Sequence, residues 1–185
     1  MNLYLVIINR EVHFNMSLKE SKQFSTILYY VIMMCFLLFL FSFNSLAQEA
    51  EYIKMYKPLA KSLEKEFEIP YEVILGVAII ESGAGKTKVS RLHNNHFGIV
   101  GKNKTKYKTR YRHFNSSQAS FRSFCLLVKR RKFYDSLKGN KDYKVWVVAL
   151  SKTGYSSQPV VWQNKIDKVI QEKLLNTQPK NKKAD

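Results

Sequence analysis

The sequence predicts a mostly helical α+β domain with a small β-hairpin lobe. Three observations point to this fold class. Apolar residues recur at three- and four-residue intervals through most of the chain after residue 48, which is the period of amphipathic helices. Aromatic and basic residues alternate between residues 107 and 114, which is typical of a strand. Glycines and prolines stand at the boundaries between these segments, where they begin or end helices.

The first 47 residues are predicted to form a secretory signal peptide. Residues 27–43 are an almost unbroken apolar run, preceded by Lys19 and Lys22 and followed by a small-x-small ending that places cleavage after Ala47. An uncleaved N-terminal anchor is the alternative, because about 17 apolar residues are at the short limit for a membrane span. Met16 lies where a conventional signal peptide begins, so a start at that residue stays open.

The remaining chain is predicted to be an exported protein of the cell envelope or the extracellular space. Residues 48–176 have the usual size of a single domain, and residues 177–185 read as a disordered basic tail. We expect no stable membrane span after cleavage. Cys125 is then the one cysteine left, so packing rather than disulfides must hold the domain together. The oligomeric state is not predicted.

Two helices open the predicted domain. Residues 49–67 show helical spacing, with Pro58 expected to kink or divide the helix. The next helix starts at Pro70, is apolar nearly all round and ends at Gly83, which is typical of a buried helix. Glu81 lies in its last turn, where burial and the helix dipole both disfavour an ionised carboxylate. Spacing alone leaves two roles open for Glu81: catalysis, or a carboxylate that reaches solvent or pairs with a lysine.

The β-hairpin and three more helices follow. Residues 97–114 are the predicted hairpin, with a basic loop at its centre. Ser116 or Ser117 is expected to cap the first helix after it, Asp142 to cap the second, and Pro159 to open the last.

The charge of the chain favours a polyanionic partner. The formal net charge is +17, and no acidic residue lies between Glu81 and Asp135. Such a field attracts nucleic acid, anionic lipid or an acidic wall polymer, and for an exported protein the wall polymer is preferred over nucleic acid. We expect no cofactor and no metal. His93 and His96 are three residues apart, but no carboxylate follows them until Asp135, so hydrogen bonding within the loop is the preferred role.

Glycoside hydrolysis suits this residue pattern. The reaction needs a proton donor whose raised pKa keeps it protonated near neutral pH, and Glu81 on a buried helix fits that role. Sugar rings also bind to flat apolar surfaces and to amide or hydroxyl groups. Core packing is the alternative for each aromatic residue, and Trp146 and Trp162 are assigned to the core. The candidate suppliers of these surfaces and groups are Asn94, Asn95, Tyr107, Tyr111, Phe114, Tyr155 and Trp162.

Four motifs occur in a fixed order: Glu-Ser-Gly-x-Gly from Glu81, Asn-Asn-x-Phe-Gly-Ile from Asn94, Tyr-Arg-x-Phe from Tyr111 and Gly-Tyr-x-x-x-Pro from Gly154. The set resembles the bacterial N-acetylglucosaminidases of glycoside hydrolase family 73 (mannosyl-glycoprotein endo-β-N-acetylglucosaminidase-like), which cut peptidoglycan. The resemblance covers about residues 50–175.

This resemblance implies a lysozyme-like α+β fold and cleavage of the β-1,4 bond after N-acetylglucosamine in peptidoglycan glycan strands. It also implies Glu81 as the general acid and Tyr155 as a cleft residue important for activity. The motif residues expected to bind substrate are Asn94, Asn95, Phe97, Tyr111, Arg112 and Phe114.

One departure from the family pattern bears on mechanism. Members often carry a further carboxylate in or just after the hairpin, where this chain has Ser117 and its neighbours. An inverting mechanism with its base in that lobe is therefore not supported. We expect substrate-assisted hydrolysis, in which Glu81 protonates the glycosidic oxygen, the 2-acetamido oxygen attacks the anomeric carbon, and Tyr155 positions that group. The alternatives are a base from Glu72 or Asp142, a lytic transglycosylase, and a non-catalytic wall-binding protein with the same fold.

Overall fold

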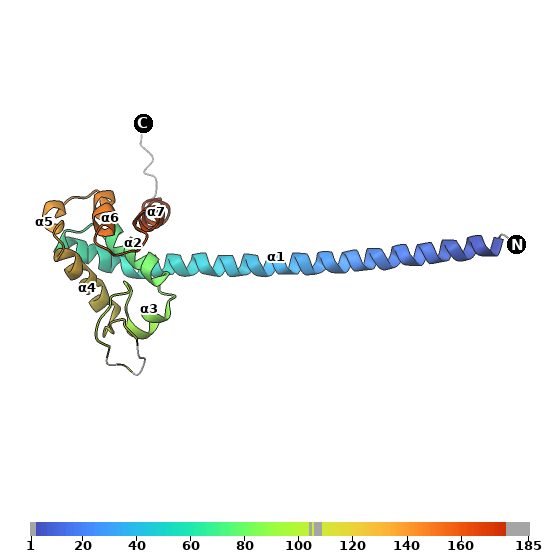
Figure 1. Cartoon of the computed structure of the whole chain (residues 1–185), viewed down its shortest axis with the longest axis horizontal. Coiled ribbons are helices and arrows are strands. Elements are labelled where there is room, and N and C mark those ends of the chain that lie inside the picture. The colour runs from blue at the N-terminus through green and yellow to red at the C-terminus, as the bar shows by residue number, and fades with distance from the viewer. Residues whose placement is uncertain (1–2, 104, 106–108, 177–185) are drawn as a thin grey trace, which may run out of the picture. The chain divides into compact units, whose positions relative to one another are not determined.

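The computed structural model describes residues 3–103, 105 and 109–176, and within its first helix the side chains of residue 23, residues 25–39 and residues from 47 onward. The regular elements within these residues are all helices (Figure 1). The chain divides into two compact units, Met1–Ala47 and Gln48–Asp185. Their boundary falls where signal-peptide cleavage is predicted, and cleavage itself stays a prediction.

Helix α1 (Leu3–Phe67) contributes residues to both units. Apolar side chains of the first unit between Ile27 and Phe39 are exposed. Among the described residues, no helix carries an apolar stretch of the length that a membrane crossing requires. In the second unit α1 continues through Pro58, so the proline does not divide the helix as one reading of the sequence allowed.

Helix α2 (Tyr71–Ser82) lies at the centre of the second unit, where it packs against α4, α6, α7 and η1 (Figure 1). The apolar run therefore forms the predicted buried helix. Pro70 precedes it, and Gly83 ends it in the left-handed conformation, with φ of 57°. Ile80 and Glu81 are partly buried, and Ser82, the last residue of the helix, is fully buried. The buried residues of α2 are Tyr71, Val73, Ile74, Leu75, Gly76, Val77, Ala78, Ile79 and Ser82.

Gly76 marks the closest approach between α2 and the C-terminal helical turns. A Cβ atom at Gly76 would lie 2.9 Å from Cγ1 of Ile170, which is itself fully buried. We expect Gly76→Ala to lower the free energy of unfolding by about 1 kcal/mol, because overpacking of this contact exceeds the helix propensity that alanine adds. Urea unfolding of the two proteins measures the difference. A variant more stable than the wild type, as expected for an uncrowded helical glycine, would contradict this contact.

Helices α4, α6 and α7 begin at the residues that the sequence indicates, whereas the short helices α3 and α5 were not predicted. Ser116 accepts a hydrogen bond from the N–H of Ala119 at the start of α4, and Asp142 accepts one from Lys144 at the start of α6. Pro159 opens α7. These three predictions are confirmed. The bounds are α3 (Lys88–His93), α4 (Ser117–Lys129), α5 (Tyr134–Leu137), α6 (Tyr143–Ser151), α7 (Pro159–Val169) and the π-helical η1 (Ile170–Leu175).

The predicted β-hairpin at 97–114 is not confirmed. Its described residues contain one antiparallel bridge, between Val100 and Tyr111, and no strand. The Asn95 side chain explains why the ladder stops there. Its amide donates to the carbonyls of Ile99 (2.9 Å) and Arg112 (2.9 Å), and its oxygen accepts from the N–H of Ile99 (3.0 Å). The Arg112 N–H still donates to the Ile99 carbonyl (2.8 Å), whereas the Ile99 N–H and the Arg112 carbonyl bond to Asn95 instead of to each other, so the ladder does not extend past this point.

Two predicted segments lie partly or wholly outside the described residues. The basic loop of the hairpin includes residues 104 and 106–108, and the predicted disordered tail is residues 177–185. The prediction for the tail therefore stays a prediction.

Candidate active site

Glu81 projects from the last turn of α2 into a tightly fixed turn. Gly83, Ala84 and Gly85 all have positive φ, at 57°, 53° and 79°. The Ser82 hydroxyl holds this turn, since it donates to the carbonyl of Ala78 (2.6 Å) and accepts from the N–H of Gly85 (2.8 Å). The carboxylate position is therefore set by backbone geometry rather than by a flexible loop.

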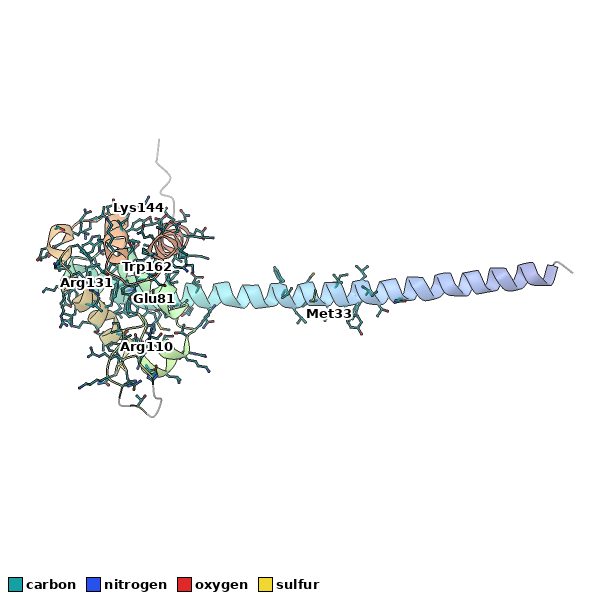
Figure 2. The ribbon with its side chains drawn as sticks, in the orientation of Figure 1. Met33, Glu81, Arg110, Arg131, Lys144 and Trp162 are labelled. Carbon is teal, nitrogen blue, oxygen red and sulfur yellow. The ribbon has the colours of Figure 1, made fainter. Side chains whose placement is uncertain are left out.

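The Glu81 carboxyl group is partly buried and has one polar partner among the described side chains. Its Oε1 accepts a 2.8 Å hydrogen bond from the indole N–H of Trp162 in α7, and Figure 2 shows the two residues next to each other. Burial raises the pKa of Glu81, and the Trp162 hydrogen bond opposes that rise. No lysine or arginine of the described chain forms an ion pair with it. A carboxyl group in this setting is suited to donate a proton.

Gly98 lies between the side chains of Glu81 and Tyr111. A Cβ atom at Gly98 would lie 3.9 Å from Oε2 of Glu81 and 3.9 Å from Cε1 of Tyr111, and the residue has φ of 62°. The backbone at this point thus faces the carboxylate directly. A side chain here would both strain the backbone and narrow the space in front of Glu81.

Tyr155 lies beside the same carboxyl group. Its hydroxyl donates to the carbonyl of Phe97 (3.0 Å), and its ring centroid is 5.3 Å from that of Trp162. Burial raises the pKa of the Tyr155 hydroxyl well above its usual value, and the negative charge of Glu81 adds to the rise. Tyr155 is therefore a neutral hydrogen-bond donor over the physiological pH range.

Trp162 is both a core residue and the hydrogen-bond partner of Glu81. Its spacing with aliphatic residues assigned it to the core, and it is indeed buried, with 6% of its surface exposed. The pattern does not show that its indole N–H meets Glu81, because that contact joins residues 81 positions apart. A buried tryptophan usually needs a hydrogen-bond acceptor for its N–H, so the sequence could indicate that Trp162 has a polar partner but not that the partner is Glu81.

The exchange of Trp162 for Phe tests this contact. The indole N–H stabilises the ionised form of Glu81, so its removal is expected to raise the Glu81 pKa and to shift the alkaline limb of the pH–rate profile to higher pH. The matched control is Trp146→Phe. The Trp146 N–H donates to the carbonyl of Asn140, away from Glu81. If the limb stays in place in Trp162→Phe, or moves equally in both variants, the contact does not tune the acid.

The asparagines of the second motif fix the backbone around the site. Asn94 has a left-handed conformation at the end of α3, and its amide donates to the carbonyl of Phe114 (3.0 Å). Asn95 is 1% exposed and makes the three hydrogen bonds given above. This burial does not support a direct contact of Asn95 with substrate and gives it a role in shaping the loop.

The other predicted substrate-binding residues divide between core and surface. Phe97 and Phe114 are buried, and Phe97 stacks on Phe124 with centroids 4.3 Å apart. Tyr111 is partly buried beside Gly98, as described above. Arg112 is exposed, and its guanidinium lies 5.0 Å from the centroid of the Phe114 ring. Tyr111 and Arg112 are therefore the members of this set with surface available to a ligand.

His96 belongs to a buried network behind the site. Its ring nitrogens bond to the hydroxyls of Tyr52 (2.8 Å) and Ser117 (2.9 Å), and Tyr52 also accepts from Ser82, the neighbour of Glu81. Burial lowers the pKa of His96 to about 4, so the ring is neutral at pH 7. Within the described residues, no group of three or more His, Cys, Asp or Glu side chains is placed to hold a metal ion.

The two carboxylates considered as alternative bases lie toward the other end of α2. Glu72 is in the first turn of the helix, and nine residues of helical rise place it about 13 Å along the axis from Glu81. The charge of Lys141 acts on Glu72, so Asp142, the next residue, belongs to the same region. An inverting pair of carboxyl groups is about 6.5–9.5 Å apart, and Glu72 does not meet that requirement.

The described part of the second unit is a helical domain with a partly buried carboxyl group at the end of its central helix. The chain belongs to the glucosaminidase family: the model of that family, described as mannosyl-glycoprotein endo-beta-N-acetylglucosaminidase, matches residues 57–175. It is therefore a glycoside hydrolase by family. No curated protein sequence matches the chain.

Three solved structures show the same fold. A peptidoglycan hydrolase from Sphingomonas sp. A1 is 22% identical, with a TM-score of 0.57 over 69% of this chain and 90% of its own. The catalytic domain of the autolysin Auto from Listeria monocytogenes is 18% identical, with a TM-score of 0.55 over 67% and 83%. A glycoside hydrolase domain of FlgJ from Salmonella typhimurium is 19% identical, with a TM-score of 0.55 over 66% and 95%. The predicted mostly helical, lysozyme-like fold is confirmed; its β-hairpin is not.

Proposed function

We propose that this chain is an exported peptidoglycan hydrolase that cleaves the β-1,4 bond after N-acetylglucosamine, with Glu81 as its general acid. The observation that carries the proposal is the Glu81 carboxyl group itself. It is partly buried, it has a raised pKa, and among the described residues it pairs with no cation. General acids of glycosidases need this setting to remain protonated near neutral pH.

Peptidoglycan is the proposed substrate because of the relatives and the charge. Solved structures with this fold include proteins named as peptidoglycan hydrolases and an autolysin. The net charge of +17 favours association with an anionic wall. Export through a signal peptide ending at Ala47 is consistent with such a substrate and rests on the apolar run at residues 27–43.

The proposed mechanism uses the substrate as its own nucleophile. Glu81 donates its proton to the glycosidic oxygen as the bond to the anomeric carbon breaks. The 2-acetamido oxygen forms the new bond to that carbon, and water then opens the resulting oxazolinium ring while the Glu81 carboxylate accepts the proton of the water. This scheme needs one protein carboxylate, and residues 82–134, which follow Glu81, contain no Asp or Glu.

Tyr155 is proposed to orient the acetamido group. Its hydroxyl is neutral and donates to the Phe97 carbonyl at 3.0 Å, beside Glu81. An acetamido oxygen arriving at this point can replace that carbonyl as the acceptor. Tyr111 across Gly98 is proposed to contact a sugar ring.

The test of the bond cut is mass spectrometry of digested, purified peptidoglycan. Fragments with reducing N-acetylglucosamine ends, formed by the wild type and absent with Glu81→Gln, are the expected result. Anhydro-muramic ends would instead identify a lytic transglycosylase. Protein that sediments with the sacculi without releasing any fragment would identify a wall-binding protein.

A further inference from the structure

A cationic groove runs along α4 beside the proposed active site. It encloses about 630 Å³. Its lining combines guanidinium groups with an apolar floor and contains no acidic residue. The lining residues with a charge are Arg112, Arg122, Arg130 and Arg131, and the floor is formed by Ile99, Phe114, Leu126 and Leu127.

Three of the four arginines have no carboxylate partner in the described chain. Arg122 pairs with Glu66, whereas Arg112, Arg130 and Arg131 form no ion pair with any described residue. The sequence explains this excess, because no Asp or Glu lies between Glu81 and Asp135 to balance them. Cations stabilise the C-terminus of α4, which accounts for the charge at Arg130, but this does not account for a groove lined from three separate stretches of the chain.

Arg131 supplies a second, independent observation. Its Nε is buried and has no hydrogen-bond partner in the described protein. The Arg131 guanidinium therefore has donor capacity that the described protein does not use, and a carboxylate is the group that a guanidinium binds best.

The groove adjoins the reacting centre. Its lining residues Ile99 and Arg112 directly follow Gly98 and Tyr111, and a Cβ atom at Gly98 would lie 3.9 Å from Oε2 of Glu81 and 3.9 Å from the Tyr111 ring. Ile99 is also two residues from Phe97, whose carbonyl accepts from Tyr155. A ligand in the groove would therefore project from the sugar chain near the bond that is cut.

We propose that this groove binds the carboxylate-bearing peptide that branches from the peptidoglycan glycan strand. This inference rests on the proposed function. In peptidoglycan the sugar that follows N-acetylglucosamine carries a short peptide, and cleavage after N-acetylglucosamine brings that sugar next to the site. The free carboxylates of the peptide meet Arg130 and Arg131, and its apolar side chains lie on Leu126 and Leu127.

The test compares peptide-bearing glycan strands with the same strands after an amidase has removed the peptides. New reducing ends are measured for the wild type, for Arg130→Gln/Arg131→Gln and for Arg91→Gln. Arg91 is an exposed arginine of α3 outside the groove and serves as the matched control. Glutamine keeps most of the arginine stem, and thermal unfolding checks that each variant is folded.

We expect the wild type and Arg91→Gln to have a lower KM for peptide-bearing than for stripped strands. The preference is the KM for stripped strands divided by the KM for peptide-bearing strands. In Arg130→Gln/Arg131→Gln this ratio should fall about tenfold, as expected from the loss of charged hydrogen bonds. An unchanged ratio overturns the inference. If the ratio is unchanged because both KM values rise by the same factor, the groove binds the sugar chain and not the peptide.

A binding measurement separates this inference from the proposed function. If the wild type cuts neither substrate, the proposed function fails, and sedimentation with intact and with peptide-stripped sacculi decides about the groove. Retention by intact sacculi alone, lost in Arg130→Gln/Arg131→Gln, supports the peptide site. Equal retention by both kinds of sacculi, or release by a polyglycerol phosphate competitor as readily as by added peptide, overturns it.

Discussion

Glu81→Gln is expected to lower kcat on peptidoglycan by about 10³-fold, within the range that general acid catalysis contributes. Glutamine is nearly isosteric, and its side-chain oxygen can still accept the hydrogen bond that Trp162 donates to Glu81 at 2.8 Å. It cannot donate a proton of the required acidity to the leaving oxygen. The measurement is the rate of reducing-end formation with sacculi at saturating concentration.

The stability of Glu81→Gln provides the control. Burial raises the folded-state pKa of Glu81, so the native protein binds more protons than the unfolded chain between the ordinary carboxyl pKa and the raised one. Stability is therefore lost as the pH rises through that window. Replacing Glu81 removes this cost, and the variant should unfold at or above the wild-type temperature at pH 7. Retained activity in a folded Glu81→Gln protein would show that another group protonates the leaving oxygen.

Tyr155→Phe is expected to lower kcat by about 10²-fold, which is the usual effect of losing one donor aimed at a group that reacts. The change removes the hydroxyl that donates to the Phe97 carbonyl and keeps the ring, which lies 5.3 Å from Trp162 and 6.3 Å from Phe124 between centroids. Packing beside the site should therefore remain. Single-turnover rates on glycan strands measure the effect on chemistry apart from product release.

Tyr143→Phe is the matched control for this change. Tyr143 is also buried, and its hydroxyl donates to Asp167 at 2.6 Å, between α6 and α7. Its loss should reduce stability without a comparable loss of kcat. Equal effects of the two substitutions on kcat would indicate that Tyr155 acts through packing alone.

Local signals in the sequence were sufficient for the longer helices and for the position of Glu81 in α2, but not for the short helices α3 and α5. The buried helix α2 follows from an apolar run bounded by Pro70 and Gly83, and helix starts at Ser116, Asp142 and Pro159 follow from residues that satisfy free N–H groups or fix φ. Each of these signals acts within a few residues, so it needs no knowledge of the tertiary structure.

Contacts between distant segments account for what the sequence did not show. Asn95 bonds to the Ile99 N–H and the Arg112 carbonyl, which would otherwise pair with each other, and alternation of residue types does not encode these bonds. Trp162 reaches Glu81 from another helix. The site residues predicted from motifs include Phe97, which is buried, because motif spacing does not separate residues that shape a cleft from residues that line it.

Glu81 is proposed to work without a second protein carboxylate, through attack by the substrate's own acetamido group. The most direct test is NMR of the anomeric proton in the first products released from glycan strands, before mutarotation. Two displacements at the anomeric carbon retain its configuration, so the β-anomer is the predicted initial product. Initial release of the α-anomer would show single displacement by an activated water, which requires a base, and would contradict the account.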